Sequence, residues 1–264
     1  MKSRSALVLD ELRSKLRSAS VAQVGGFRPP ADPLTSWFLN GVALPGEGLP
    51  LWKGQPMFPL LQIRIDELPV IPEQLKDVAL LVLFHNIESH PFDKPHGEGW
   101  LVREYATLEG LELLPATDTP YRAFPVRWIG VNDDAPGWED AWDIIDLSDV
   151  NDDQEASDRF HDDFKRYRGT KVGGYPMEIQ HGVGIEDFVF QVGSEDKVNW
   201  MWADNGIGYF HKSPEGLWTF SCQFYRAYNV SVSLQVDSPC HRPNSFIRDS
   251  ACLLRIYPKW APRK

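Results

Sequence analysis

Histidines and carboxylates between residues 85 and 96 are the first candidates for chemistry in this chain. His85, His90 and His96 lie in one short stretch, with Glu88 and Asp93 between them. Imidazole and carboxylate ligands together suit zinc or iron. Spacings of five and six residues, however, match neither one face of a helix nor the turn of a zinc finger. We therefore expect a solvated loop here, with no metal and no cofactor.

A second candidate is a polar pocket between two parts of the chain. The residues that could line it are Gln62, Gln180, Gln191, Trp202 and Asp204. Asp204 belongs to an Asp-Asn-Gly sequence typical of a hairpin turn, so its carboxylate either binds a ligand or hydrogen-bonds its own backbone. The glutamines either line the pocket or satisfy buried backbone groups. The sequence leaves both alternatives open.

Catalytic motifs do not add to these candidates. The sequence has no GxSxG, HExxH, P-loop or GxGxxG pattern. Its three cysteines, Cys222, Cys240 and Cys252, are odd in number, widely spaced and without a CxxC pair. This pattern favours reduced thiols in a cytoplasm over a disulfide framework. We predict no catalytic residues and a protein that binds rather than reacts.

The strongest signal is a concentration of negative charge in residues 132–163. Thirteen acidic residues and one base, Arg159, give this segment a net charge of −12, whereas the whole chain carries −10. The remainder, with 26 bases and 24 acids, is close to neutral. We predict that a partner binds the acids and two tryptophans of this segment: Asp133, Asp134, Trp138, Glu139, Asp140, Trp142, Asp143, Asp146, Asp149, Asp152, Asp153, Glu155, Asp158, Asp162 and Asp163.

Such charge repels nucleic acid and anionic membranes and attracts a basic protein or divalent cations. Aromatic side chains among the acids, such as Trp138 and Trp142, are typical of interface hot spots. A simple solvated surface is the first alternative. Calcium is the second, although the segment 149–158 lacks the ligand spacing and central glycine of an EF-hand.

The elements that must position these residues are mostly strands. An amphipathic helix is expected over residues 5–19, within an N-terminal segment 1–20. A single domain, 21–264, follows, with two halves of about 21–131 and 165–264 joined by the acidic segment 132–164. The acidic segment itself is expected to form two short helices. Alternating or continuously apolar runs predict strands at Leu60–Ile65, Val78–Phe84, Trp100–Tyr105, Leu111–Leu114, Tyr121–Val131, Phe188–Val192, Trp200–Trp202, Ile207–His211, Trp218–Phe224, Val230–Val236 and Cys252–Tyr257.

The two halves echo each other in sequence. Val24-Gly25-Gly26-Phe27 is similar to Val172-Gly173-Gly174-Tyr175, and a strand with a glutamine follows each. Leu81–His85 is similar to Ile207–His211. We therefore predict a β-rich α+β fold of two similar antiparallel halves with a few short helices. Asp10 and Glu11 interrupt any signal-peptide pattern, and no apolar run reaches the length of a membrane span, which predicts a cytoplasmic protein.

These motifs also carry a family resemblance. The Gly-Gly pairs, the sequence from Lys171 to Gln180, Phe190-Gln191 and the sequence from Met201 to Gly206 resemble the YwqG-like family of bacterial proteins, over roughly residues 24–225. In that family the last motif usually reads Trp-Gly-Asp-x-Gly, and here Ala203 replaces its first glycine. The resemblance implies a β-rich α+β fold with a pseudo-repeat and brings no established activity. Some members occur near toxin genes, which suggests an immunity role.

The functional prediction combines charge and resemblance. We expect a non-enzymatic immunity protein whose acidic surface binds and neutralises a cognate bacterial toxin, one that acts on nucleic acid or nucleotides. The alternatives are an enzyme or small-ligand binder with a pocket between the halves, and a scaffold protein that binds a basic partner other than a toxin.

Overall fold

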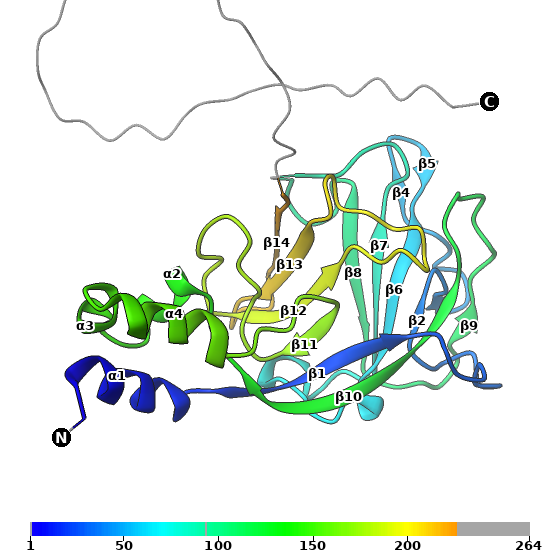
Figure 1. The fold of residues 1–264 in the computed structure, drawn as a ribbon. Helices are drawn as coiled ribbons and strands as arrows, with labels where there is room; N and C mark the ends of the chain where they lie inside the picture. The colour runs from blue at the N-terminus through cyan, green and yellow to red at the C-terminus, as the bar shows by residue number, and fades with distance from the viewer. Residues whose placement is uncertain (1, 93, 226–264) are drawn as a thin grey trace, which may run out of the picture. The chain divides into compact units, whose positions relative to one another are not determined.

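A computed structural model describes residues 2–92 and 94–225 of the chain (Figure 1). The predicted strands at Val230–Val236 and Cys252–Tyr257 lie outside these residues, as does Asp93. Within the two described ranges, none of the helices has the length and apolar character needed to cross a bilayer.

Ten antiparallel strands form the main sheet. In chain order they are β1 (Arg17–Val24), β2 (Trp37–Phe38), β6 (Phe58–Arg64), β7 (Leu80–His85), β8 (Trp100–Tyr105), β10 (Phe124–Asp134), β11 (Lys171–Gly173), β12 (Phe188–Gly193), β13 (Ile207–Lys212) and β14 (Trp218–Gln223). Across the sheet the order is β14-β13-β12-β11-β1-β10-β2-β6-β7-β8. Two small ribbons, β3 (Val42–Ala43) with β9 (Glu112–Leu113) and β4 (Leu51–Trp52) with β5 (Gln55–Pro56), and two short 3-10 turns, η1 (Ile65–Glu67) and η2 (Glu73–Leu75), complete the β-rich part.

The sheet order reveals two similar runs that meet at the β1–β10 pair. One run is β10-β2-β6-β7-β8 and the other is β1-β11-β12-β13-β14. Gln62 of β6 pairs with strands on both sides, and Gln191 of β12 holds the corresponding place in the second run. The β-rich α+β fold with a pseudo-repeat is therefore confirmed.

The sheet curves until its two edges approach each other. Trp100 of the edge strand β8 packs against Phe220 of the opposite edge strand β14, with 5.5 Å between ring centroids. Lys212 of β13 also forms an ion pair with Glu104 of β8 at 2.7 Å. Aromatic side chains are large enough to fill the interior of such a nearly closed sheet, and burying them supplies much of its stability.

Four helices pack together at one end of the sheet, as Figure 1 shows. They are α1 (Arg4–Arg13), α2 (Trp138–Trp142), α3 (Ser148–Asn151) and α4 (Gln154–Asp163). They enclose a small core of their own, in which Leu9, Leu12, Leu147, Val150 and Phe160 are fully buried. The acidic segment thus forms three helices where the sequence predicted two.

The N-terminal helix is shorter than predicted. It ends at Arg13, where Ser14 caps it by donating its hydroxyl to the carbonyl of Glu11 at 2.7 Å. Residues 17–24 instead form β1, because they pair with β10 on one side and β11 on the other. These long-range pairings override a local helical pattern.

The residues Trp200–Trp202 do not form the predicted strand. Trp200 makes only an isolated bridge to Glu195. A turn follows, in which the amide of Gly206 donates to the carbonyl of Trp202 at 2.8 Å and Asn205 has a positive φ of 52°. This turn leads the chain into β13.

Candidate functional sites

Nine carboxylates of the acidic segment are exposed to solvent, as is one aromatic side chain of the same segment, Trp142. We define the acidic surface as Trp142 with Glu139, Asp143, Asp146, Asp149, Asp152, Glu155, Asp158, Asp162 and Asp163. Trp142 is 40% exposed. Trp138 is half-buried and packs edge-on against the buried Phe160, with 4.8 Å between ring centroids. Trp142 is therefore the aromatic side chain that this surface offers most openly to a partner.

The other four predicted contact acids hold the fold together. Asp133 accepts hydrogen bonds from Lys165 and the hydroxyl of Tyr167, at 2.8 and 2.6 Å. Asp153 caps the N-terminus of α4 and accepts a hydrogen bond from the hydroxyl of Ser5 in α1 at 2.6 Å. Asp133 and Asp153 are half-buried, and both carboxylate oxygens of each accept a hydrogen bond from within the chain.

Asp134 and Asp140 are buried and cannot meet a partner in this structure. Asp140 is 1% exposed and accepts a hydrogen bond from the amide of Gly184 at 2.9 Å. Asp134 is 0% exposed and forms an ion pair with the equally buried Lys171 at 2.6 Å. The predicted contact set therefore loses these two residues, because the neutralising and hydrogen-bonding groups come from a distant part of the chain.

Gly174, the second glycine of the second Gly-Gly pair, leaves room for the carboxylate of Asp134. Gly174 has a φ of 72°, and a Cβ atom there would lie 2.1 Å from Oδ2 of Asp134. The amide of Tyr175 then donates to the same oxygen at 2.8 Å. Burial raises the pKa of Asp134 and lowers the pKa of Lys171, and their mutual attraction opposes both shifts. This pair anchors the start of the acidic segment to β11.

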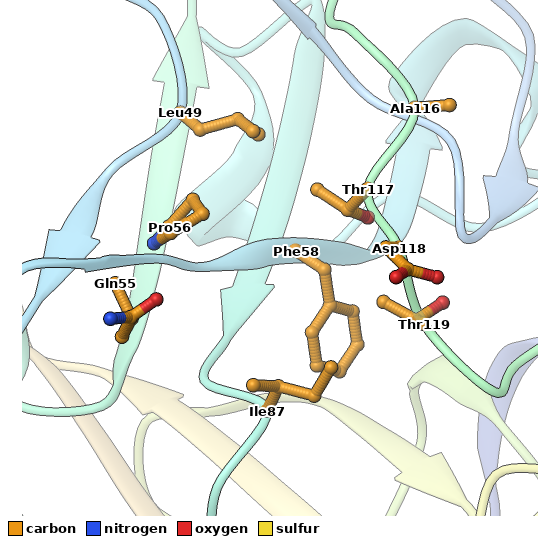
Figure 2. A pocket seen from close by; sticks show the side chains of 9 residues that line it. All are labelled: Leu49, Gln55, Pro56, Phe58, Ile87, Ala116, Thr117, Asp118 and Thr119. Atoms are coloured by element: carbon orange, nitrogen blue, oxygen red, sulfur yellow. The ribbon is translucent and has the colours of Figure 1, made fainter.

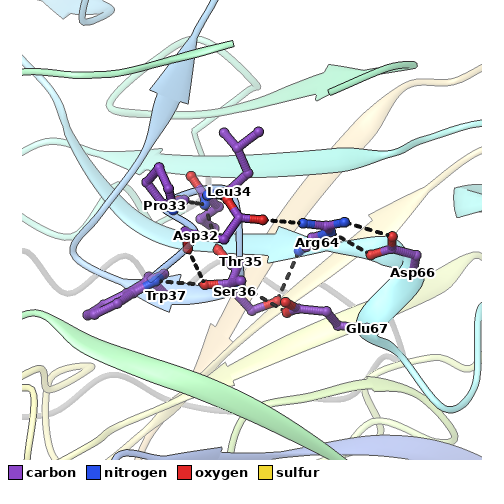
Figure 3. A network of polar contacts seen from close by, with 10 residues as sticks. Asp32, Pro33, Leu34, Thr35, Ser36, Trp37, Arg64, Asp66 and Glu67 are labelled. Atoms are coloured by element: carbon purple, nitrogen blue, oxygen red, sulfur yellow. Dashed lines mark hydrogen bonds and ion pairs between the residues drawn. The ribbon is translucent and has the colours of Figure 1, made fainter. Parts of the chain in front are cut away.

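The three glutamines of the predicted pocket each bond to a different stretch of backbone. Gln62 donates to the carbonyl oxygens of Pro33 and Thr35 at 3.0 and 2.6 Å, in the loop whose polar network Figure 3 shows. Gln191 donates to the carbonyl of Gly169 at 2.8 Å and accepts from the amide of Met177 at 2.9 Å. Gln180 is exposed and donates to the carbonyl of Phe224 at 2.6 Å.

The remaining two pocket candidates face different surroundings. Asp204 is exposed on the turn before β13, and its backbone carbonyl accepts from the amide of Tyr225 at 3.0 Å. Trp202 is 0% exposed, and its ring lies so close to Gly208 that a Cβ there would approach it to 2.7 Å. The buried Trp202 and the exposed Asp204 therefore do not act as one polar site.

Two of the three clustered histidines do come together. Ring centroids of His85 and His90 are 5.6 Å apart. His96 points elsewhere: its Nε2 accepts from the amide of Val102 at 2.9 Å, and its ring packs on Trp100. Within residues 2–92 and 94–225, no three metal-binding side chains of the His, Cys, Asp or Glu type gather in one place.

His85 and His90 instead meet two tryptophans that the sequence places far away. We define the aromatic cluster as His85, His90, Trp200 and Trp202. Trp200 lies 4.9 Å from both His85 and Trp202, and His90 lies 5.3 Å from Trp202, measured between ring centroids. Burial lowers the pKa of His85 to about 3, and the neighbouring His90 adds to this effect. His85 is therefore neutral at physiological pH.

A pocket of about 330 Å³ lies beside the aromatic cluster (Figure 2). It is lined by Leu49, Gln55, Pro56, Phe58, Ile87, Ala116, Thr117, Asp118 and Thr119. The ring of Phe58 also contacts the cluster, with centroids 5.7 Å from His85 and 6.0 Å from Trp200. Sequence reasoning missed this pocket, because its walls come from four separate stretches of the chain.

Comparison with known proteins gives a family but no activity. A search of curated proteins finds no match for this chain. A family model described as "Domain of unknown function (DUF1963)" matches residues 42–229, which is more than half of the chain. This match includes the aromatic cluster, the acidic segment and every strand of the main sheet except β1 and β2. The chain therefore belongs to the DUF1963 family.

Proposed function

We propose that this chain is a non-enzymatic immunity protein that binds and neutralises a cognate bacterial toxin through the acidic surface. The observation that carries the proposal is that nine carboxylates and Trp142, all within residues 139–163, are exposed to solvent. A basic surface, such as the substrate site of a toxin that acts on nucleic acid or nucleotides, is the natural complement. The chain would act in the cytoplasm.

The state of the exposed acids supports this proposal. Asp143, Asp149, Glu155 and Asp162 make no side-chain hydrogen bond or ion pair with any other residue that the structure describes. Acids that lie within about 10 Å of one another repel at physiological salt, and none of these four forms an ion pair with a base that the structure describes. A basic partner would relieve that repulsion. The negative field of the acids would also steer such a partner toward the surface.

An exposed tryptophan gives the same surface a means of holding a partner. Electrostatic steering mainly raises association rates, whereas buried aromatic side chains slow dissociation. Trp142 precedes the unpaired Asp143 in the sequence and packs against Trp138, with 6.2 Å between ring centroids. A partner that covered Trp142 would bury apolar area in a segment rich in charge.

Family resemblance is the second support. Beyond the DUF1963 match, the Lys171–Gln180 and Met201–Gly206 motifs resemble the YwqG-like family, some members of which occur near toxin genes. That association favours an immunity role over a general scaffold role. It adds no mechanism of its own.

Reversal of charge tests the proposal. We would immobilise the full chain and a variant with Asp143→Lys, Asp149→Lys, Glu155→Lys and Asp162→Lys, and expose both to extract of the source cells. We expect the unaltered chain to retain one basic protein and the variant to lose at least nine-tenths of it. The retained protein, once purified, should inhibit growth, and co-expression of the unaltered chain alone should restore it.

A matched control separates surface from total charge. Asp77, Glu98, Glu109 and Glu186 are also exposed carboxylates but lie outside the acidic segment. Their reversal to lysine changes the net charge equally and should leave capture and protection intact. Equal capture by the reversed acidic surface would refute the proposal, and a captured protein without toxicity would replace the immunity role by a scaffold role.

A further inference from the structure

Unpaired polar atoms concentrate at one place in the described part of the chain. Six buried side-chain nitrogen or oxygen atoms there have no hydrogen-bond partner. Four of the six belong to the aromatic cluster: Nε2 of His85, Nδ1 of His90, Nε1 of Trp200 and Nε1 of Trp202. His85, Trp200 and Trp202 are 2%, 1% and 0% exposed. Buried polar groups in native proteins are nearly always paired, so four exceptions on mutually packed rings indicate a missing partner.

Hydrogen bonds on the other ring nitrogens define what that partner must offer. Nδ1 of His85 contacts the carbonyl of Asn86 at 2.5 Å and must donate to it, so Nε2 is left as an acceptor. Nε2 of His90 accepts from the amide of Ala203 at 3.2 Å, so Nδ1 carries the proton. With the two indole N–H groups, the cluster presents three donors and one acceptor.

Elsewhere the same fold supplies partners for buried indoles. Nε1 of Trp100 donates to the carbonyl of Lys94 at 2.8 Å, and Nε1 of Trp128 donates to the hydroxyl of Ser36 at 2.9 Å. An unpaired buried donor lowers stability, because the hydrogen bond that it makes to water in the unfolded chain is not replaced. Edge-to-face contacts between the cluster rings offset only part of this loss of stability, because an N–H directed at a ring is a weak hydrogen bond.

Charge narrows the class of ligand. The aromatic cluster contains no carboxylate and no permanent cation, and burial keeps His85 neutral. A charged ligand would lose its hydration without a counter-charge in return, which is costly. A neutral group with acceptor oxygens and one N–H donor satisfies the cluster, and a planar group can pack on the faces or edges of aromatic rings.

The adjoining pocket provides a place for the rest of such a ligand. Figure 2 shows the rings and side chains that line it, with Phe58 beside Ile87, and Phe58 also contacts His85 and Trp200. Phe58 therefore belongs to both the pocket lining and the surroundings of the cluster, and a ligand that spans both requires this side chain to turn.

We propose that the aromatic cluster is the polar end of a binding site for a small, planar, uncharged amide or imide. Carbonyl oxygens of the ligand accept from the indoles of Trp200 and Trp202 and from His90, and its N–H donates to His85. The apolar remainder of the ligand occupies the pocket beside Phe58. This site is independent of the acidic surface and of any toxin.

Benzamide and benzoate test the proposal as a matched pair, because they share a ring and differ in charge at the amide position. Binding to the full chain can be followed by the indole N–H resonances of 15N-labelled protein. We expect benzamide and the imide uracil to shift the resonances of Trp200 and Trp202, and benzamide to bind at least ten-fold more tightly than benzoate. Trp200→Phe and Trp202→Phe should each weaken benzamide binding by about ten-fold.

Trp128→Phe is the matched control, since it removes a buried indole whose N–H already has a partner. It should leave benzamide binding unchanged. If either cluster variant fails to fold, His90→Phe serves instead, because His90 is only half-buried. Absence of any response to both benzamide and uracil, equal affinity for benzamide and benzoate, or unchanged binding in the folded cluster variants would each overturn the proposal.

Discussion

Asp134 and His85 are both buried side chains that can carry charge, yet their surroundings differ. The carboxylate of Asp134 receives hydrogen bonds from Lys171 at 2.6 Å, from the amide of Tyr175 at 2.8 Å and from the amide of Tyr167 at 3.4 Å. The ring of His85 uses one nitrogen, and its other nitrogen has no partner among the described residues.

The difference separates buried polar groups that stabilise the fold from buried polar groups that do not. At the base of the acidic helices, charge is buried with its partners and fixes the start of a segment in which nine other acids are exposed to solvent. In the aromatic cluster, polar nitrogens are buried without partners, which costs stability. Proteins depart from full hydrogen bonding mainly at functional sites. The predictions below test this contrast, from the largest expected effect to the smallest.

Removal of the buried cation should have the largest effect. Lys171→Met leaves Asp134 buried without its counter-charge, which typically costs about 3–5 kcal/mol. Urea unfolding of the variant and the unaltered chain measures this loss. Lys165→Met removes the exposed partner of Asp133 and should cost far less, because surface ion pairs contribute little. Equal losses in the two variants would contradict the structural role of the buried pair.

Acid should destabilise the protein through His85. The pKa of His85 is about 3 in the folded chain, whereas an unfolded histidine titrates near its ordinary value of 6.5. The unfolded chain therefore binds the extra proton between these values, and stability falls as pH drops below about 6.5, by about 1.4 kcal/mol per pH unit for this group.

Denaturation at pH 7.5 and 5.5 measures this dependence. His85→Phe should remove a loss of about 1.4 kcal/mol over that interval. Some dependence will remain, because burial also lowers the pKa of His90 and His211. An unchanged pH dependence in the His85→Phe variant would argue against a neutral, buried imidazole.

Two equally buried tryptophans should respond differently to loss of the indole N–H. Trp100 and Trp200 are each 1% exposed, but only Trp100 has a hydrogen-bond partner. In the ligand-free chain, Trp100→Phe should therefore cost about 1 kcal/mol more than Trp200→Phe. Chemical denaturation of both variants checks this, and a larger cost at Trp200 would mean that its N–H is satisfied in the folded protein.

Reversal of the free acids should have the smallest effect on stability. The variant with lysine at positions 143, 149, 155 and 162 should unfold within about 0.5 kcal/mol of the unaltered chain, as surface substitutions usually do. Relief of repulsion should raise its midpoint slightly at low salt, and the gain should vanish at high salt. Thermal unfolding of both chains at low and at high salt measures this change in midpoint. A large loss would show that these acids hold the helices in place.

Much of the sheet could be predicted from the sequence because its strands are continuously apolar or alternate regularly. Predicted and observed bounds coincide for Trp100–Tyr105 and differ by at most three residues for Val78–Phe84 and Tyr121–Val131. The strand β1 could not be predicted, since residues 17–24 become extended only through partners more than a hundred positions away.

The candidate sites were predictable only in part, for the same reason. Composition alone located the acidic segment, but the burial of Asp134 and Asp140 depends on Lys171 of β11 and on Gly184, both of which follow later in the chain. The proximity of His85 and His90 is visible in the sequence, whereas Trp200 joins them only through the curvature of the sheet. Such sites depend on tertiary contacts that no local pattern encodes.

The most direct test of the acidic surface is capture from extract of the source cells by the full chain, with elution at increasing salt and identification by mass spectrometry. Our account predicts one stoichiometric basic protein, bound at low salt and released as salt rises. Absence of any such protein at low salt would contradict it and leave the exposed acids as a solvated surface.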